Sequence, residues 1–256
     1  MSNERTPTVI IDDVHINYRV TLGSKVSSAA GALRSLIRGS SPSQLIKNVH
    51  AVRGVSITAY EGDVIGLIGR NGSGKSSLLR AVAGLQKLES GEIYTAGRAS
   101  LLGVRAALNK SISGDRNITL GGLAMGMTRD EIDERRESII KFAELEDYIE
   151  MPMGTYSSGM QARLRFSIAA SRSHDIMLVD EALSTGDTEF RRRSQDKIRE
   201  LAGNAGTVFL VTHGHNMIRE VCNRAIWMDK GSIKMDGNVE EVLAAYEQDI
   251  ESKKTS

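Results

Sequence analysis

Val64-Ile65-Gly66-Leu67-Ile68-Gly69-Arg70-Asn71-Gly72-Ser73-Gly74-Lys75-Ser76-Ser77-Leu78-Leu79 is the stretch that decides the fold. An apolar run predicts a buried strand, a glycine-rich loop follows it, and a helical pattern begins near Lys75. Residues 69–76 match G-x-x-x-x-G-K-[ST], the phosphate-binding loop. The alternative is a chance glycine-rich turn, but such a turn rarely lies between a buried strand and an amphipathic helix. The stretch therefore predicts a nucleotide-binding site.

The residue types of this loop suit a bound polyphosphate. Gly69, Gly72 and Gly74 allow a tight turn that brings backbone N–H groups close to oxyanions. The positive end of the following helix dipole favours the same negative charge. Lys75 can reach the β- and γ-phosphates, and the Ser76 hydroxyl suits Mg²⁺.

Composition restricts the class of protein. The chain has 256 residues and a formal net charge of +1, which argues against a general nucleic-acid binder. Its single cysteine, Cys222, excludes an internal disulfide and is consistent with a reducing compartment. Residues 1–7 have no apolar signal core, and no apolar run has the roughly 18–20 residues of a membrane span. We therefore expect a cytosolic protein whose membrane role comes through a partner.

Alternating strand and helix patterns predict an α/β fold with a parallel sheet. We expect strands at 8–20, 49–59, 64–68, 91–94, 175–180, 207–212, 221–229 and 232–235, helices at 75–82, 128–148, 160–170 and 239–246, and a polar tail at 251–256. The predicted organisation is an N-terminal core part (1–97), a helical subdomain (98–172), a C-terminal core part (173–240) and a short C-terminal helix with a tail (241–256).

Residues 21–47 form a basic insertion between two predicted strands. The segment contains Lys25, Arg34, Arg38 and Lys47 and no acidic residue, and its leucines have the spacing of a short amphipathic helix. One interpretation is a solvated loop. The other is a surface that faces anionic lipid or a membrane partner.

Three ionisable residues follow predicted parallel strands. Asp180 and Glu181 end the apolar run 176–179, and His213 follows the run 208–212. Because ligands bind at the carboxyl ends of parallel strands, these residues can share a pocket with the phosphate loop. Asp180 suits Mg²⁺, Glu181 could polarise an attacking water, and His213 could contact the γ-phosphate. The alternative is that they are a solvated strand end and a structural histidine.

Several motifs in order resemble the nucleotide-binding domain of ABC transporters over roughly residues 8–240. They are the phosphate loop, a signature-like Tyr156-Ser157-Ser158-Gly159-Met160, the acidic strand end at 176–180, a D-loop-like Ser184-Thr185-Gly186-Asp187, and Val211-Thr212-His213. The Tyr-Ser-Ser-Gly-Met form is similar to the ATPases of polysaccharide exporters, as are the stretches 52–56 and 113–118. The resemblance implies a P-loop NTPase core with a mainly parallel sheet, an antiparallel β subdomain and an inserted helical subdomain.

The resemblance also implies roles for residues. Bound ATP would be held at its phosphates by Gly69, Arg70, Asn71, Gly72, Ser73, Gly74, Lys75, Ser76 and Ser77. Mg²⁺ would be served by Ser76 and Asp180, with Glu181 as general base and His213 as switch histidine. Ser157, Ser158, Gly159 and Asp187 would act across a homodimer that sandwiches two ATP molecules. Tyr18 is a candidate adenine-stacking aromatic or a half-buried strand aromatic, and His50 is a second candidate for adenine.

The resemblance further implies a cellular location and a transported substrate. The chain would lie peripherally on the cytoplasmic side of the membrane and power export of a lipid-linked polysaccharide through a separate permease. Some members carry a C-terminal carbohydrate-binding domain, for which this chain is expected to be too short. The alternatives are an ABC ATPase that does no transport and a weakly hydrolysing regulatory module.

One departure from the family pattern concerns hydrolysis. The family has Gln, or often Glu in this subfamily, in a loop before the helical subdomain, and Gly103 takes that place here. A ligand to the metal or the attacking water would then be absent unless a nearby group such as Asn109 replaces it. We therefore expect ATP binding with slow basal hydrolysis.

Overall fold

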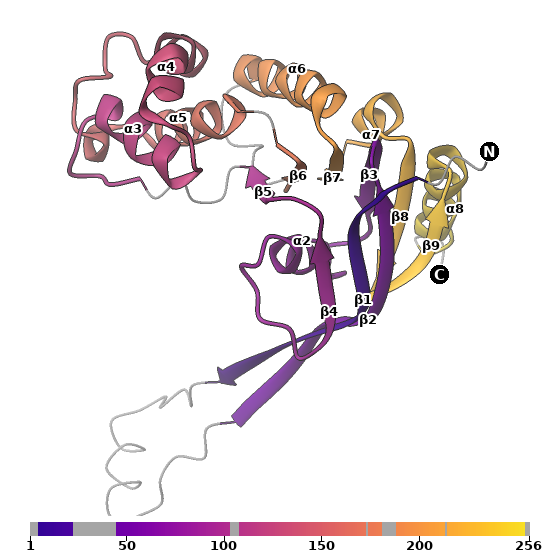
Figure 1. Cartoon of the computed structure of the whole chain (residues 1–256). Coiled ribbons are helices and arrows are strands. Elements are labelled where there is room, and N and C mark those ends of the chain that lie inside the picture. The colour runs from indigo at the N-terminus through magenta and orange to yellow at the C-terminus, as the bar shows by residue number, and fades with distance from the viewer. Residues whose placement is uncertain are drawn as a thin grey trace, which may run out of the picture.

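Two β-sheets form the body of the protein, and a group of helices projects to one side (Figure 1). The computed structural model describes residues 5–22, 45–102, 108–172, 174–180, 188–212 and 214–253. The larger sheet has six strands in the order β5-β6-β7-β3-β8-β9. The described part of the chain begins and ends on the side of helix α8 (Figure 1).

The six-stranded sheet is parallel apart from one edge. Five strands run parallel, namely β5 (Ala99–Leu102), β6 (Ile176–Val179), β7 (Thr207–Val211), β3 (Asp63–Ile68) and β8 (Arg224–Asp229), and β9 (Ser232–Gly237) pairs with β8 antiparallel. Every residue of β6 and β7 is buried, as expected for strands that are covered on both faces. The predicted mainly parallel sheet is confirmed.

The smaller sheet is antiparallel, with the order β2-β1-β4. Its strands are β1 (Pro7–Leu22), β2 (Leu45–Tyr60) and β4 (Ser90–Thr95). Val9, Ile11, Val14 and Ile16 of β1 are fully buried, and the register shifts around Asp13, which has a φ of 44°. The β1–β2 ribbon extends away from the body toward its far end (Figure 1).

Helices cover both faces of the parallel sheet. One hydrophobic core joins a sheet face to α5 (Ser158–Ala170), α6 (Thr188–Asn204), α7 (His215–Val221) and α8 (Val239–Ser252). A second core joins the other face to α2 (Lys75–Val82) and to the antiparallel sheet. The phosphate-loop strand β3 therefore lies at the centre of the molecule, between two packed layers.

The helical part has its own core. It consists of α3 (Gly114–Ala124), α4 (Arg129–Ala143), the short helix η1 (Met153–Thr155) and the first half of α5, packed around Ile118, Ile132 and Leu164. The sequence Thr128-Arg129-Asp130-Glu131 has the spacing that predicts a capping box at the start of α4. The structure confirms it, because Thr128 and Glu131 exchange side chain to backbone hydrogen bonds of 2.7 and 3.2 Å.

Five sequence-based boundaries were wrong. The strand predicted at 49–59 begins at Leu45 and β1 continues to Leu22, so residues 21–22 and 45–47 of the predicted basic insertion belong to strands. Helix α4 ends at Ala143 rather than 148, because Glu144 adopts a left-handed conformation with φ 53° and its carboxylate binds Arg163 at 2.6 Å. Residues 99–102, assigned to the helical subdomain, form β5 and belong to the main sheet. The predicted strand 221–229 begins only at Arg224, since α7 occupies the preceding residues. Helix α8 continues to Ser252, beyond the predicted end at 246.

Candidate nucleotide-binding site

The loop between β3 and α2 has a backbone that only glycine fits at two positions. Gly69 has φ 142°, and a Cβ there would lie 2.2 Å from the carbonyl oxygen of Met228. Gly74 has φ 104°, and a Cβ there would lie 2.3 Å from the carbonyl oxygen of Ala51. The loop therefore packs directly against neighbouring backbone, which fixes its curvature. It surrounds a cavity of about 230 Å³ that is lined by residues 71–77 and Val211.

Lys75 is held by the loop that it follows. The side chain is buried, and Nζ donates to the carbonyl oxygen of Gly69 at 2.7 Å and to that of Arg70 at 3.1 Å. No side chain caps α2, whose N-cap is Gly74. The first N–H groups of the helix and the ammonium group therefore meet at one cavity, an arrangement that favours a bound anion.

Ser76 and Asp180 come from distant parts of the sequence and meet at the cavity. The Ser76 hydroxyl donates to Oδ1 of Asp180 at 3.0 Å, and the Asp180 side chain is buried. The parallel register explains the meeting, because β3 and β6 both lie beside β7 and end at the same edge of the sheet. A hydroxyl and a carboxylate so placed are oxygen ligands of the kind that Mg²⁺ takes.

Tyr18 lies beside the phosphate-loop helix. Its hydroxyl is 3.1 Å from Oγ of Ser77 and 3.1 Å from Oε1 of Gln86, and its half-buried ring packs on the core beneath the antiparallel sheet. His50 is exposed on β2, where its backbone pairs with Asn17. The structure thus brings Tyr18 to the site by a polar contact, and the adenine contact stays a prediction for both residues.

The signature-like residues lie on the helical part. Ser157 is the N-cap of α5, where Oγ accepts the N–H of Met160 at 3.1 Å, and Ser157 and Ser158 are exposed. Neither they nor Gly159 line the phosphate-loop cavity. Within one chain they are therefore separate from the candidate site, and their role across a dimer stays a prediction.

Four predicted site positions lie outside the described residues, namely Glu181, His213, Asp187 and Gly103, as does most of the predicted basic insertion, residues 23–44. Thr212 and Gly214, on either side of His213, are described, and so is Asp180, which directly precedes Glu181. The proposed substitute for a missing ligand, Asn109, is used locally, because its side-chain oxygen accepts the N–H of Ser111 at 2.9 Å.

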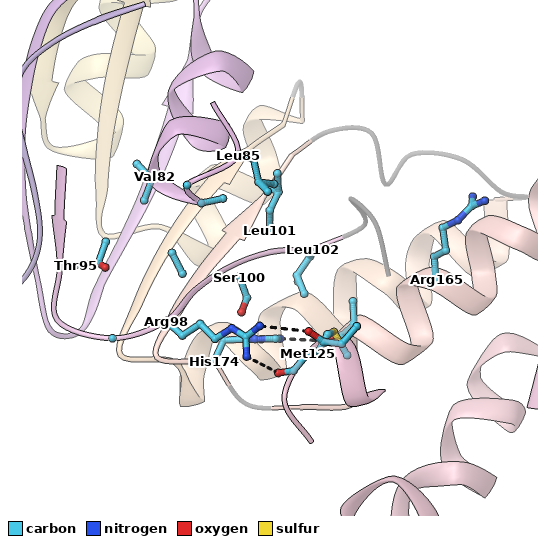
Figure 2. Close-up of a pocket in the computed structure, with 16 residues that line it drawn as sticks. Val82, Leu85, Thr95, Arg98, Ser100, Leu101, Leu102, Met125, Arg165 and His174 are labelled. Carbon is cyan, nitrogen blue, oxygen red and sulfur yellow. Dashed lines mark hydrogen bonds between the residues drawn. The ribbon is translucent and has the colours of Figure 1, made fainter. Parts of the chain in front are cut away.

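A second cavity, of about 450 Å³, lies where the sheet meets the helical part (Figure 2). Arg98 donates to the carbonyl oxygens of Met125 at 3.0 Å and Ala124 at 3.3 Å, and Arg172 also donates to that of Met125. Two cations therefore meet the C-terminal end of α3, where the helix dipole favours them. His174 lines the same cavity, and burial lowers the pKa of its imidazole.

Sequence reasoning missed this second cavity. Its lining comes from the end of α2, from β5, from the end of α3 and from α5, and Leu85 at its rim is 57 % exposed. The available signal in the sequence was Leu85, an apolar residue directly after Gly84, where the phosphate-loop helix ends. That Leu85 lies near β5 and α3 depends on long-range packing, which the sequence pattern does not show.

The fold and the site together define a phosphate-binding-loop nucleotide-binding protein. Residues 52–184 match the family described as ABC transporter. The chain is 43 % identical over 206 residues to the teichoic acids export ATP-binding protein TagH of Staphylococcus epidermidis, covering 80 % of this chain and 78 % of that one. It is 36 % identical over 249 residues to the O-antigen export system ATP-binding protein RfbB of Myxococcus xanthus. That match covers 96 % of this chain and 57 % of the relative.

A solved structure shares the fold. The dimeric post-hydrolysis ATP-binding cassette MJ0796 bound to ADP and Pi aligns with a TM-score of 0.68 and 20 % identity, over 90 % of this chain and 98 % of that one. The chain belongs to the ABC transporter family and is an ATP-hydrolysing ABC ATPase. No helix in the described ranges combines the length and the hydropathy that crossing a lipid bilayer requires.

Proposed function

We propose that the chain powers the export of a lipid-linked polysaccharide through a separate membrane permease. The observation that carries this proposal is the Ser76–Asp180 contact at the phosphate-loop cavity, in a chain whose relatives are named for export of teichoic acids and O-antigen. The contact joins the phosphate-binding loop to the acidic strand end, the two parts that phosphoryl transfer requires.

The same residues fit Mg²⁺. The Asp180 carboxylate is buried, and it already accepts one hydrogen bond from Ser76, which lines the phosphate-loop cavity. A buried carboxylate is best stabilised by a neighbouring cation, and oxygen ligands are those that Mg²⁺ prefers. Mg²⁺ bound there would neutralise charge on the phosphate oxygens. Ser76 and Asp180 are the residues that would hold it.

The protein side chains have separate tasks in this proposal. Backbone N–H groups of residues 69–77 and the Lys75 ammonium hold the phosphates. Glu181 accepts a proton from the attacking water, and His213 contacts the γ-phosphate and positions that water.

We also propose that two copies form a dimer. Ser157, Ser158, Gly159 and Asp187 of one copy would then complete the site of the other. The exposure of Ser157 and Ser158, away from their own phosphate loop, supports this arrangement.

The second cavity is the proposed seat of the permease (Figure 2). A short apolar helix from a cytoplasmic loop of the permease is the occupant that fits, because the cavity joins the sheet to the helical part and has Leu85 at its rim. An occupant there would contact both parts at once and sense their relative position. Residues 21–47, whose charge is basic, would face the anionic membrane or the permease in the same assembly.

The proposal is tested by depleting the chain in its host and measuring lipid-linked polysaccharide on each side of the membrane. We expect the polymer to accumulate inside and the surface polymer to fall, with rescue by the native chain but not by the Lys75→Ala variant. Unchanged surface polysaccharide would contradict the proposed cargo and leave the ATPase assignment intact.

A further inference from the structure

Helices α7 and α8 are joined by a network of charged side chains. Nδ1 of His215, the first residue of α7, lies 3.0 Å from Oε1 of Glu247 on α8. One turn further along α7, Arg219 donates to the same Oε1 at 3.3 Å and to Oε2 of Glu240 at 3.2 Å. A single carboxylate, that of Glu247, therefore contacts both residues on this face of α7.

The His215 ring is also held by aromatic packing. It meets the ring of Tyr246 edge-on, with centroids 5.8 Å apart, and Tyr246 meets Trp227 of β8 at 5.4 Å. Tyr246 and Trp227 are both buried, so α8 is anchored on the main sheet where it contacts His215. The position of Glu247 is thereby fixed relative to the strands that carry the site.

His215 begins the helix that follows the end of β7. Val211, the last residue of β7, pairs with Leu67 of β3 and lines the phosphate-loop cavity. The Thr212 hydroxyl then accepts the N–H of Gly214 at 3.1 Å, and no side chain caps α7 at Gly214. The described residues that follow β7 are thus held by a local turn at Thr212 and Gly214 and by the packed ring of His215.

We propose that Glu247 is a positioning residue for ATP hydrolysis. Through His215 it fixes the start of α7 and the turn formed by Thr212 and Gly214, the two residues that flank His213 in the sequence. The hydrogen bond from His215 lowers the pKa of Glu247, so the carboxylate is charged at neutral pH. This inference rests on the proposed role of His213, and it extends the hydrolytic machinery to α8, beyond the matched residues 52–184.

The energetics separate this role from a structural one. The Glu247 and His215 side chains are 43 % and 29 % exposed, and ion pairs with such exposure contribute little to stability. A purely structural role therefore predicts a small change in melting temperature and a normal rate. A positioning role predicts a lower rate, because small misplacements of groups near the reacting atoms are costly.

Glu247→Gln is the first variant to measure, by steady-state ATP hydrolysis of the purified chain. We expect kcat to fall on the order of tenfold with KM for ATP within about twofold, since misplacement rather than lost phosphate binding is the defect. Glu247→Asp, which keeps the charge, should recover part of the loss. Asp249→Asn is the control, because Asp249 lies on the same helix but pairs with Lys234 and Lys253, each at 2.6 Å. It should keep the native kcat.

A double-mutant cycle with His215→Gln tests the pathway. If Glu247 acts through His215, the double variant loses no more than the worse single variant. A native kcat in Glu247→Gln, or losses that multiply in the double variant, would overturn the proposal. His213→Ala distinguishes the failures: native turnover in that variant contradicts the proposed role of His213 itself, whereas a loss there with normal turnover in Glu247→Gln contradicts only the role of Glu247.

Discussion

The phosphate-loop cavity and the second cavity are built in opposite ways. The first is lined by seven consecutive residues, 71–77, with Val211. The second is lined by segments between residues 82 and 174 that come from α2, β5, α3 and α5. Binding of phosphate is therefore encoded in one short stretch, whereas the surface between the sheet and the helical part exists only after the chain has folded. Variants in the two regions should separate chemistry from coupling.

The largest effect on turnover is expected at Glu181, the proposed general base. Glu181→Gln should lower turnover by on the order of 10²–10⁴, the usual contribution of a general base, and keep ATP binding, because Ser76 and Asp180 are untouched. Unhydrolysed ATP should then hold a dimer together. Sizing the variant with Mg²⁺ and ATP, beside a turnover assay, checks both results. Native turnover would remove Glu181 from its role.

The backbone of the phosphate loop should be the next most sensitive feature. Gly74→Ala places a Cβ 2.3 Å from a carbonyl oxygen at φ 104°, whereas Gly72→Ala, at φ 81°, meets nothing within 4 Å. Both variants carry backbone strain of about 1–3 kcal/mol, and only Gly74→Ala adds a clash. Thermal unfolding and ATP affinity should both fall further for Gly74→Ala. Equal losses would show that conformation alone restricts this loop.

Changes at the second cavity should weaken permease binding and leave the rate of ATP hydrolysis unchanged. Leu85→Gln should weaken co-purification with the permease by about tenfold, since burying one leucine is worth about 1.5–3 kcal/mol. Tyr94→Ser is the control, because Tyr94 is 55 % exposed but is not among the residues that line this cavity. Soluble ATPase activity should stay native in both. Loss of permease binding in the control would mean that the partner sits elsewhere.

The smallest change is expected at Gly103, which directly follows Leu102 in the sequence. Gly103→Gln should raise the basal rate a few-fold if a side-chain oxygen there serves the metal or the attacking water. Asn109 is the alternative source of such a ligand, and its side-chain oxygen accepts the N–H of Ser111. Melting temperature measured beside the rate separates a gain in chemistry from the strain of roughly 1 kcal/mol that a side chain would cause if Gly103 has a positive φ. A stable variant with an unchanged rate would show that this position does not need a ligand.

Features formed by residues close in sequence could be predicted from the sequence, as in the phosphate-loop cavity. The strand, loop and helix around residues 64–82 and the capping box at Thr128 depend on neighbours in sequence, and they were predicted. The approach of Asp180 to Ser76 was permitted by the expected parallel sheet, and the structure measures it at 3.0 Å. These features are local or follow from a simple topological rule.

Features that depend on distant partners were missed. Strand β5 has four residues and its partner β6 lies 77 residues further along, so no local pattern marks it as a sheet strand. The early end of α4 depends on Glu144, whose carboxylate is held by arginines from α5 and α6. The contacts of Glu247 with His215 join α8 to α7, and neither residue belongs to a motif. Pairings of this kind arise from tertiary packing, which overrides local preference.

The central claim is that the phosphate loop and Asp180 form one Mg²⁺-dependent ATP-hydrolysing site. Phosphate release by the purified chain, with and without Mg²⁺ and in Asp180→Asn, tests it most directly. We predict turnover that requires Mg²⁺ and falls by on the order of 10²-fold or more in Asp180→Asn, because that variant loses a charged oxygen next to Ser76. Turnover without Mg²⁺, or native turnover in Asp180→Asn, would contradict the account.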